Sequence, residues 1–160
     1  MFRKIILLAL LCLGLNTAAV ADEAATAPLQ TGDALPAIAL KDQFDKPQSV
    51  AADAQTLLFV IEKLASDLVN DYLMKQGKDF LAAHKAYFIA DISGMPSMIT
   101  KMFALPKMQE RPYSILLAYD AEEVAFMPRE KNKVTVVKLA GGKVESVQHV
   151  DSEAALAEAF

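Results

Sequence analysis

Cysteine is nearly absent from this sequence. The 160 residues contain one cysteine, Cys12, and no tryptophan. A single thiol excludes an intramolecular disulfide, a Cys-x-x-Cys redox pair and a zinc site built from several thiolates. Cys12 lies inside the apolar run 5–15, so the fate of that run decides whether the working protein has any thiol at all.

Basic clusters and common catalytic motifs are missing as well. The chain has 16 Lys and Arg against 20 Asp and Glu, a net charge of −4, and this acidic balance argues against a nucleic-acid partner. It contains no G-x-G-x-x-G, G-x-S-x-G or H-E-x-x-H sequence. Nothing therefore supports a dinucleotide site, a serine hydrolase or a zinc protease, and we expect no cofactor.

The segment 1–21 has the pattern of a removed secretory signal peptide. It begins with two basic residues, continues in the apolar run 5–15 and ends in the small residues Ala-Val-Ala. The run is shorter than a membrane-spanning helix needs, and an uncleaved anchor is the alternative. The large Leu11 directly before Cys12 argues against lipid attachment to that cysteine.

Cleavage would remove the only cysteine and two basic residues. The mature chain would have a formal charge of 14 − 20 = −6 and no second long apolar run, so we expect no stable membrane insertion. The Ala- and Thr-rich stretch 22–31 is expected to be a flexible tether, and 32–160 has the length of one compact domain. These features predict a periplasmic or otherwise secreted protein.

Strand and helix patterns alternate through the expected domain. The segments 56–62 and 85–92 are apolar on both faces, as central strands are when helices cover both sides of a sheet. Between them, Ser66 is placed to cap a helix. After the second strand, Pro96 suits a first helical turn, and Pro106 is expected to end the helix that follows.

The last third of the chain predicts a hairpin and a final helix. A third central strand is expected over 113–119, and Ala140-Gly141-Gly142 is typical of a hairpin turn between the last two strands. Asp151 or Ser152 would cap the closing helix. Together these elements predict the α/β class, as a three-layer α/β/α sandwich around a mixed central sheet with a C-terminal β-hairpin and helix.

This order of parts resembles the thioredoxin-like superfamily, in particular its secreted TlpA-type and peroxiredoxin-like members. The resemblance implies the family's opening strand and turn, the strand leading to its active site, a later strand ending in Asp, and its closing hairpin and helix. It covers nearly all of 32–160. The stretches that carry it are "GDALPAIALKDQFDKPQSV", "TLLFVIE", "PYSILLAYD" and "KVTVVKLAGGKVESVQHVDSEAALAEAF".

Two functional features of that family have no match. Its C-x-x-C motif would fall at about 64–67, where a helix N-terminus stabilises a thiolate, and Leu64 and Asp67 have no thiol. Its cis-proline would fall near 129–133, and the nearest proline, Pro128, comes too early. The resemblance therefore implies the fold without the oxidoreductase activity, and no catalytic residue is assigned.

Polar residues nevertheless gather where that active site would lie. They follow the ends of two neighbouring strands, which meet at one edge of an open α/β sheet, where such folds bind ligands, and Arg129 could approach that edge from a third side. The same residue types equally suit a solvated loop and a helix cap. The candidate binding residues are Glu62, Lys63, Ser66, Asp67, Asp91, Ser93, Pro96 and Arg129.

Methionines offer a second pattern. Met95, Met98 and Met102 are spaced i, i+3, i+7, which predicts one shared helix face. Thioethers suit Cu(I), but methionines at helical spacing also form core stripes and adaptable partner-binding surfaces.

From these observations we expect a periplasmic thioredoxin-like protein without thiol redox activity that binds a protein or peptide partner beside the former active-site loop. One alternative is a non-thiol enzyme or small-ligand binder at the strand-end loops, and another is copper handling by the methionines. A deep pocket with perturbed carboxylates would favour an enzyme, and a flat face would favour a binder.

Overall fold

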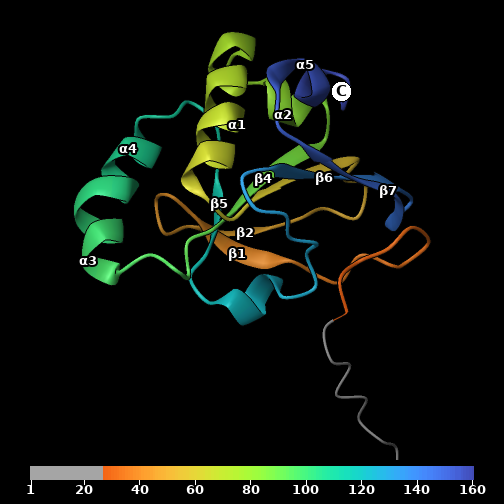
Figure 1. Cartoon of the computed structure of the whole chain (residues 1–160), viewed down its shortest axis with the longest axis horizontal. Coiled ribbons are helices and arrows are strands. Elements are labelled where there is room, and N and C mark those ends of the chain that lie inside the picture. Colours follow the sequence, from red (N-terminus) through yellow and green to blue (C-terminus); the bar gives the residue numbers. More distant parts are fainter. Residues whose placement is uncertain (1–26) are drawn as a thin grey trace, which may run out of the picture.

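The computed structural model describes residues 27–160, so the expected signal segment 1–21 and the positions 22–26 lie outside the described residues. Seven strands form one mixed sheet in the order β2-β1-β5-β4-β3-β6-β7 (Figure 1). The pairs β3–β4 and β4–β5 are parallel, and the other neighbours are antiparallel. The strands are β1 (Ala39–Asp42), β2 (Pro47–Ser49), β3 (Thr56–Val60), β4 (Ala86–Asp91), β5 (Leu116–Ala118), β6 (Val134–Ala140) and β7 (Lys143–Val150).

Helices cover the two faces of the sheet unequally. Within 27–160, the longer helices lie on one face, while the other carries only a 3₁₀ turn and irregular chain (Figure 1). The predicted α/β architecture is confirmed, but the layer on the second face of the sheet contains little helix. The helical elements are α1 (Lys63–Gln76), α2 (Phe80–Ala83), α3 (Ser97–Ile99), the π-helical η1 (Thr100–Ala104), α4 (Leu105–Gln109), the 3₁₀ turn η2 (Ala121–Val124) and α5 (Glu153–Ala157).

The central strand β3 explains the two-sided core. All five of its residues are buried. Leu58 and Val60 pack into the cluster under the long helices, whereas Leu57 and Phe59 pack into the cluster on the opposite face. This alternation follows from the two-residue period of a strand, and it accounts for the continuous apolar run in the sequence.

Helix α1 begins earlier than the sequence predicted. Its N-cap position is Glu62, so Ser66 lies inside the first turn and does not cap the helix. The interpretation of Ser66 as the cap was wrong because the helix already starts at Lys63, with only two residues between it and the end of β3. Val69 and Leu73 are buried on its inner face, and the helix ends at Gly77, whose φ of 96° suits a glycine.

Proline does not end the second helical segment. The elements α3, η1 and α4 run on without a break from 97 to 109, and Pro106 lies in the first turn of α4. The prediction that Pro106 stops the helix was wrong. Proline lacks an amide hydrogen and crowds the carbonyl four residues earlier, and the wider π turn of η1 directly before it changes that spacing.

The third central strand is shorter than predicted, at Leu116–Ala118 instead of 113–119. The buried side chain of Gln43 takes the place of a strand partner just before it. Its Nε2 donates to the carbonyl of Tyr113 at 2.8 Å, and its Oε1 accepts from the amide of Ile115 at 2.9 Å. A side-chain amide therefore satisfies backbone groups that a ladder would otherwise pair.

The C-terminal hairpin and helix match the prediction. β6 and β7 pair in antiparallel fashion, and the glycines of the turn have φ values of 58° and 77°. Of the two predicted caps, Ser152 is the one used, because its side chain accepts a hydrogen bond from the amide of Ala155 at 3.3 Å. The terminal Phe160 then packs against Tyr72 and Phe80.

The folded part of the chain reaches further towards the N-terminus than 32. Leu29 is buried, and its amide donates to the carbonyl of Phe126 at 2.8 Å. The last residues of the stretch expected to be a tether, 27–31, therefore include a packed side chain. In the described part of the chain, no helix is both long and apolar enough to span a membrane.

Candidate functional site

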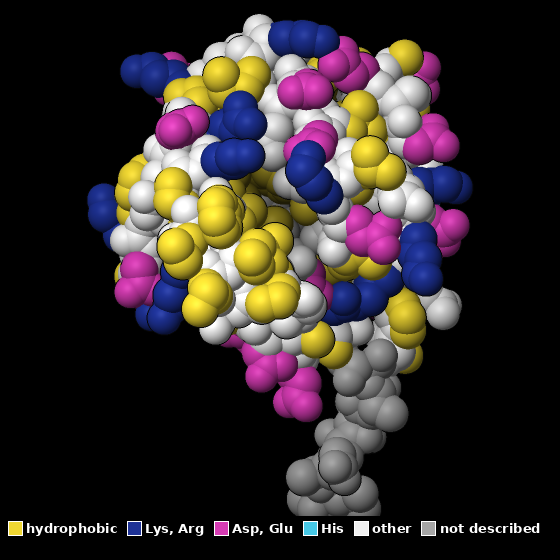
Figure 2. All heavy atoms as spheres, turned by 60° about the vertical axis from the view of Figure 1, so that its left-hand side comes forward, with side chains coloured by type: hydrophobic (Ala, Val, Ile, Leu, Met, Phe, Trp, Pro, Cys, Tyr) yellow, Lys and Arg dark blue, Asp and Glu magenta, His cyan; other side chains and the backbone are white. Residues whose placement is uncertain are grey.

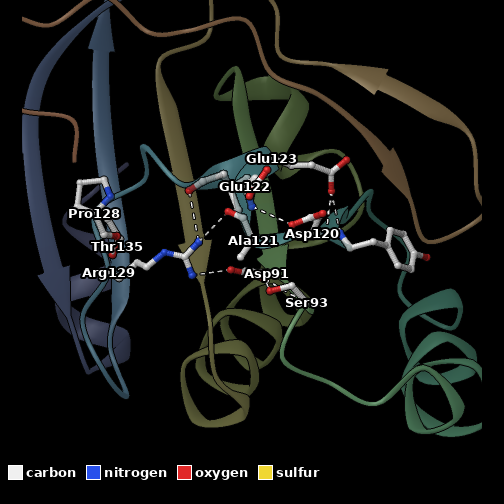
Figure 3. A network of polar contacts seen from close by, with 11 residues as sticks. Asp91, Ser93, Asp120, Ala121, Glu122, Glu123, Pro128, Arg129 and Thr135 are labelled. Carbon is white, nitrogen blue, oxygen red and sulfur yellow. Dashed lines mark hydrogen bonds and ion pairs between the residues drawn. The ribbon is translucent and has the colours of Figure 1, made fainter. Parts of the chain in front are cut away.

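A buried ion pair lies at the carboxyl end of β4. Asp91 is the last residue of that strand, and its Oδ2 contacts Nη1 of Arg129 at 2.5 Å. Its Oδ1 accepts hydrogen bonds from the amide and the hydroxyl of Ser93, at 2.9 and 2.6 Å. Figure 3 shows Arg129 reaching across to Asp91 from the chain that leads into β6. Three of the candidate residues thus meet, Asp91 and Ser93 at the end of β4 and Arg129 from the chain before β6.

The charge state of Asp91 follows from this arrangement. Burial raises the pKa of Asp91, but the two hydrogen bonds from Ser93 and the guanidinium of Arg129 outweigh it, so the net pKa lies below the usual value for aspartate. At neutral pH the group is an ionised carboxylate with a committed partner. It is therefore a poor proton donor.

Arg129 also ties three segments together. Its Nη2 lies 3.5 Å from the carbonyl of Ala121 and 3.4 Å from that of Val124, and its guanidinium carbon lies 5.5 Å from the ring centre of Phe59 (Figure 3). The guanidinium thus connects η2, β3 and the end of β4. The geometry assigns Arg129 a bracing role at the strand ends.

The candidates on α1 are more exposed. Lys63 and Asp67 form an ion pair one helical turn apart on the solvent side, where such pairs contribute little to stability. Glu62 accepts a hydrogen bond at 2.8 Å from the amide of Asn132. Because Asn132 belongs to the loop that carries Arg129, this hydrogen bond holds that loop against the start of α1.

The observed helix start also moves the expected position of a C-x-x-C motif. The first turn of α1 follows Glu62 and not Leu64, so the four positions at the helix N-terminus are Glu62, Lys63, Leu64 and Ala65. None of them is cysteine. Pro128, the proline nearest to the family's cis-proline position, accepts a hydrogen bond from the Thr135 hydroxyl at 2.9 Å, and the described residues contain no cis peptide bond.

A groove of about 300 Å³ runs between α1 and the α3–η1–α4 segment. Five of the eight candidate binding residues line it, whereas Pro96 and Arg129 do not. Ser93 instead lines a broader hollow of about 1000 Å³ on the other side of α3, beside the β1–β2 hairpin. The groove is lined by Val60, Ile61, Glu62, Lys63, Ser66, Asp67, Asn70, Ala90, Asp91, Ile92, Met95, Ile99, Phe103, Ala104, Lys107, Met108 and Arg111.

The outer wall of this groove belongs to an exposed apolar surface. On α3 and η1, Met98, Ile99, Met102 and Phe103 are 69%, 44%, 62% and 57% exposed, and Leu64 of α1 is 65% exposed. We call these five residues the apolar face. Figure 2 shows hydrophobic side chains gathered on this side of the molecule beside a hollow. Exposed apolar groups at this density mark interaction sites in soluble proteins.

The sequence predicted the helical spacing of Met98 and Met102 but not the exposure of this face. Apolar residues at helical spacing are usually buried, but Thr100 is the one buried residue of the segment 97–109.

The three methionines of the predicted stripe do not all lie on the helix. Met95 precedes the helix and is half-buried, while Met98 and Met102 lie on it. In 27–160, no group of three or more His, Cys, Asp or Glu is placed to hold a metal ion. Copper binding by the methionines stays a prediction.

Comparisons with known proteins find likeness in structure alone. No protein-family model matches the chain, and no curated protein matches it either. A thiol:disulfide interchange protein of the thioredoxin family from Chlorobium tepidum superposes with a TM-score of 0.55 and 14% identity, covering 80% of this chain and 93% of its own. The peroxidoxin BcpB from Mycobacterium tuberculosis gives 0.52 and 15%, over 81% and 92%.

An uncharacterized thioredoxin-like protein from Porphyromonas gingivalis has a TM-score of 0.51 and 18% identity, over 80% of this chain and 90% of that protein. Identities this low carry no statement about shared activity. They do agree on one architecture over four fifths of the chain. The protein therefore has the thioredoxin-like fold that its sequence resembles.

Proposed function

We propose that this chain is an exported thioredoxin-like protein that has no thiol redox activity and binds a protein or peptide partner. The binding site in this proposal is the groove between α1 and α3–η1–α4 together with the apolar face beside it. Export rests on the pattern of the first 21 residues, which lie outside the described residues.

The absence of thiol chemistry is supported by composition and position together. The only cysteine of the chain is Cys12, inside the expected signal segment. At the start of α1, where the family stabilises a thiolate, the N-cap is Glu62. Without a thiol, electron transfer by thiol–disulfide exchange has no reacting atom.

One observation carries the binding proposal: an open, largely apolar groove lies directly at the carboxyl ends of β3 and β4. Its floor includes Val60, Ala90 and Ile92, and the exposed Ile99 and Phe103 form a wall. Large apolar side chains gain free energy when a partner removes them from water, at about 25 cal/mol per Å². A partner segment in the groove would therefore bury surface that the isolated protein leaves wet.

An enzyme of another chemistry at the same loops has less support. Asp91 is held by Arg129 and by Ser93, which leaves this carboxylate little freedom to move a proton. The groove is open to solvent and does not enclose a substrate. The enzyme alternative stays a prediction that requires a catalytic group other than Asp91.

Export and redox chemistry are tested on the protein that cells secrete. N-terminal sequencing of the exported product should find a start at Asp22 and no Cys12. The same product should reduce insulin disulfides with dithiothreitol no faster than buffer does. A product that retains Cys12, or that accelerates insulin reduction, would contradict the redox part of the proposal.

Binding is tested by comparing two substitutions of similar chemistry. Phe103→Asp places a charge in the groove wall, and Met74→Asp places one on an exposed apolar side chain of α1 outside the groove. Proteins from periplasmic extract should be retained by the wild type and by Met74→Asp, and lost from Phe103→Asp. Equal retention by all three forms would place binding elsewhere, and repeated failure to retain any specific protein would count against a binding role.

A further inference from the structure

The two ends of the groove differ in the charged side chains that have no ion-pair partner. Lys107 and Arg111, which line the groove at the C-terminal end of α4, take part in no ion pair within 27–160. Lys63 is neutralised by Asp67, and Asp91 by Arg129. The end of the groove at α4 therefore carries two cations without an ion-pair partner in the described part of the chain, and Asp71, whose charge acts on Tyr113 together with that of Arg111, does not line the groove.

The neutral polar groups of α1 that line the groove leave one donor without an acceptor. Asn70 is fully engaged: its Nδ2 donates to the carbonyl of Ser66 at 2.7 Å and to its hydroxyl oxygen at 3.2 Å, and its Oδ1 accepts from the Tyr113 hydroxyl at 2.7 Å. The hydroxyl hydrogen of Ser66 has no acceptor among the described residues. Ser66 lies four residues from Glu62 and four from Asn70, so its hydroxyl is in the middle of the groove, whereas the two cations call for an acceptor such as a carboxylate at the α4 end.

An anion lies at the opposite end. Glu62 is at the start of α1, whereas Asn70 stands eight residues further along the helix, a rise of about 12 Å. Tyr113 contacts Asn70 and follows Arg111 by two residues, which puts the two cations near the Asn70 end. A bound carboxylate is therefore attracted at α4 and repelled at Glu62, which gives the bound segment a direction.

The space between these ends is apolar and small. Val60, Ala90 and Ile92 on the floor meet Ile99 and Phe103 on the wall. A volume of about 300 Å³ is at the lower end of the range for small-ligand sites, about 300–1,000 Å³. It admits one or two large side chains, not a folded surface.

We propose that the groove recognises a peptide segment with one or two large apolar side chains next to an acidic side chain, the carboxylate meeting Lys107 and Arg111. This inference rests on the proposed binding function and adds the chemistry of the partner. It assigns Lys107 and Arg111 as specificity-determining residues.

The test is a selection from a random twelve-residue peptide library displayed on phage, made with three forms of the mature protein. The second form carries Lys107→Glu with Arg111→Glu. The third carries Lys101→Glu, a single charge reversal on the same helical segment, at a residue that lines the broader hollow and not the groove. Wild type and Lys101→Glu should enrich peptides in which Asp or Glu adjoins Leu, Phe, Ile or Met, and the double variant should enrich Lys or Arg instead.

Affinities of selected peptides give the quantitative check. A synthetic peptide from the wild-type selection should lose about tenfold or more in affinity when its acidic residue is replaced by the neutral amide, because each charge-assisted hydrogen bond is worth about 1.5 kcal/mol or more. Selected peptides without acidic enrichment would overturn the inference and leave the binding function standing. No selected peptide from any form would count against both.

Discussion

Removing the Arg129 guanidinium should leave the Asp91 carboxylate buried without its cation. The side chain of Asp91 is 4% exposed and that of Arg129 is 34% exposed. The substitution Arg129→Met keeps an unbranched apolar stem but removes the ion pair, the two contacts with the carbonyls of η2, and the position over the Phe59 ring.

The expected loss is about 2–3 kcal/mol in the free energy of unfolding at pH 7. Breaking a fully buried pair costs roughly 3–5 kcal/mol. Two features lower that figure here: Ser93 keeps its two hydrogen bonds to Asp91, and water reaches the partly exposed arginine site. For a domain of this size the loss corresponds to a fall of about 5–10 °C in Tm.

Acidic pH should reduce the difference in unfolding free energy between wild type and Arg129→Met. Because the folded-state pKa of Asp91 lies below its usual value, its contribution to stability is complete at neutral pH and is lost as the pH falls through that folded pKa. Without Arg129, only the hydrogen bonds from Ser93 counteract burial, so the pKa of Asp91 rises. Wild type and Arg129→Met should therefore differ most at pH 7 and least near pH 3.

Urea denaturation followed by circular dichroism at several pH values measures both effects. The double variant Arg129→Met with Asp91→Asn serves as the control, because it removes the charge along with its partner and should recover about 1–2 kcal/mol relative to the sum of the single changes. A loss below about 0.5 kcal/mol at pH 7, or a loss that is the same at pH 7 and pH 3, would refute the bracing role.

Three other substitutions test the packing around the site. Tyr113→Phe should lower the free energy of unfolding by about 1–2 kcal/mol, since it removes the hydroxyl that donates to Asn70. In the wild type, burial raises the pKa of Tyr113 to about 12. Absorbance titration should therefore show one tyrosine that ionises only near that pH. Gln43→Ala should lower the free energy of unfolding by about 2–3 kcal/mol, because two buried backbone groups before β5 lose their hydrogen-bond partner. A loss under about 0.5 kcal/mol would contradict the role of Gln43 as that partner. Phe160→Ala should lower stability by about 1–2 kcal/mol in urea denaturation through loss of its aromatic contacts; an unchanged midpoint would show that the terminus does not hold α1 and α2.

The elements that the sequence predicted well are those whose pattern is set by burial on a sheet. Strands β3 and β4 are apolar on both faces because both faces are covered, and the hairpin turn has the glycines that its positive φ values require. Asp91 and Ser93 meet Arg129 because the parallel strands β3 and β4 end at one edge, and β6, antiparallel to β3, begins at that edge.

The features that escaped prediction depend on local backbone geometry or on contacts between distant segments. The early start of α1 and the π turn before Pro106 reflect local backbone choices that no residue type specifies. The short β5 depends on Gln43, which is distant in sequence. Exposure of Met98 and Phe103 was also hidden, because an apolar stripe at helical spacing looks the same whether a core or a partner covers it.

The central claim is that a partner occupies the groove between α1 and α3–η1–α4. Site-specific photocrosslinking in cells that export the protein tests it most directly, with p-benzoyl-phenylalanine at Phe103 in the groove wall and, as a control of similar exposure, at Phe44 on the β1–β2 hairpin. The account predicts a discrete crosslinked protein from position 103 and none from position 44. Crosslinks from position 44 alone, or from neither position in repeated trials, would contradict it.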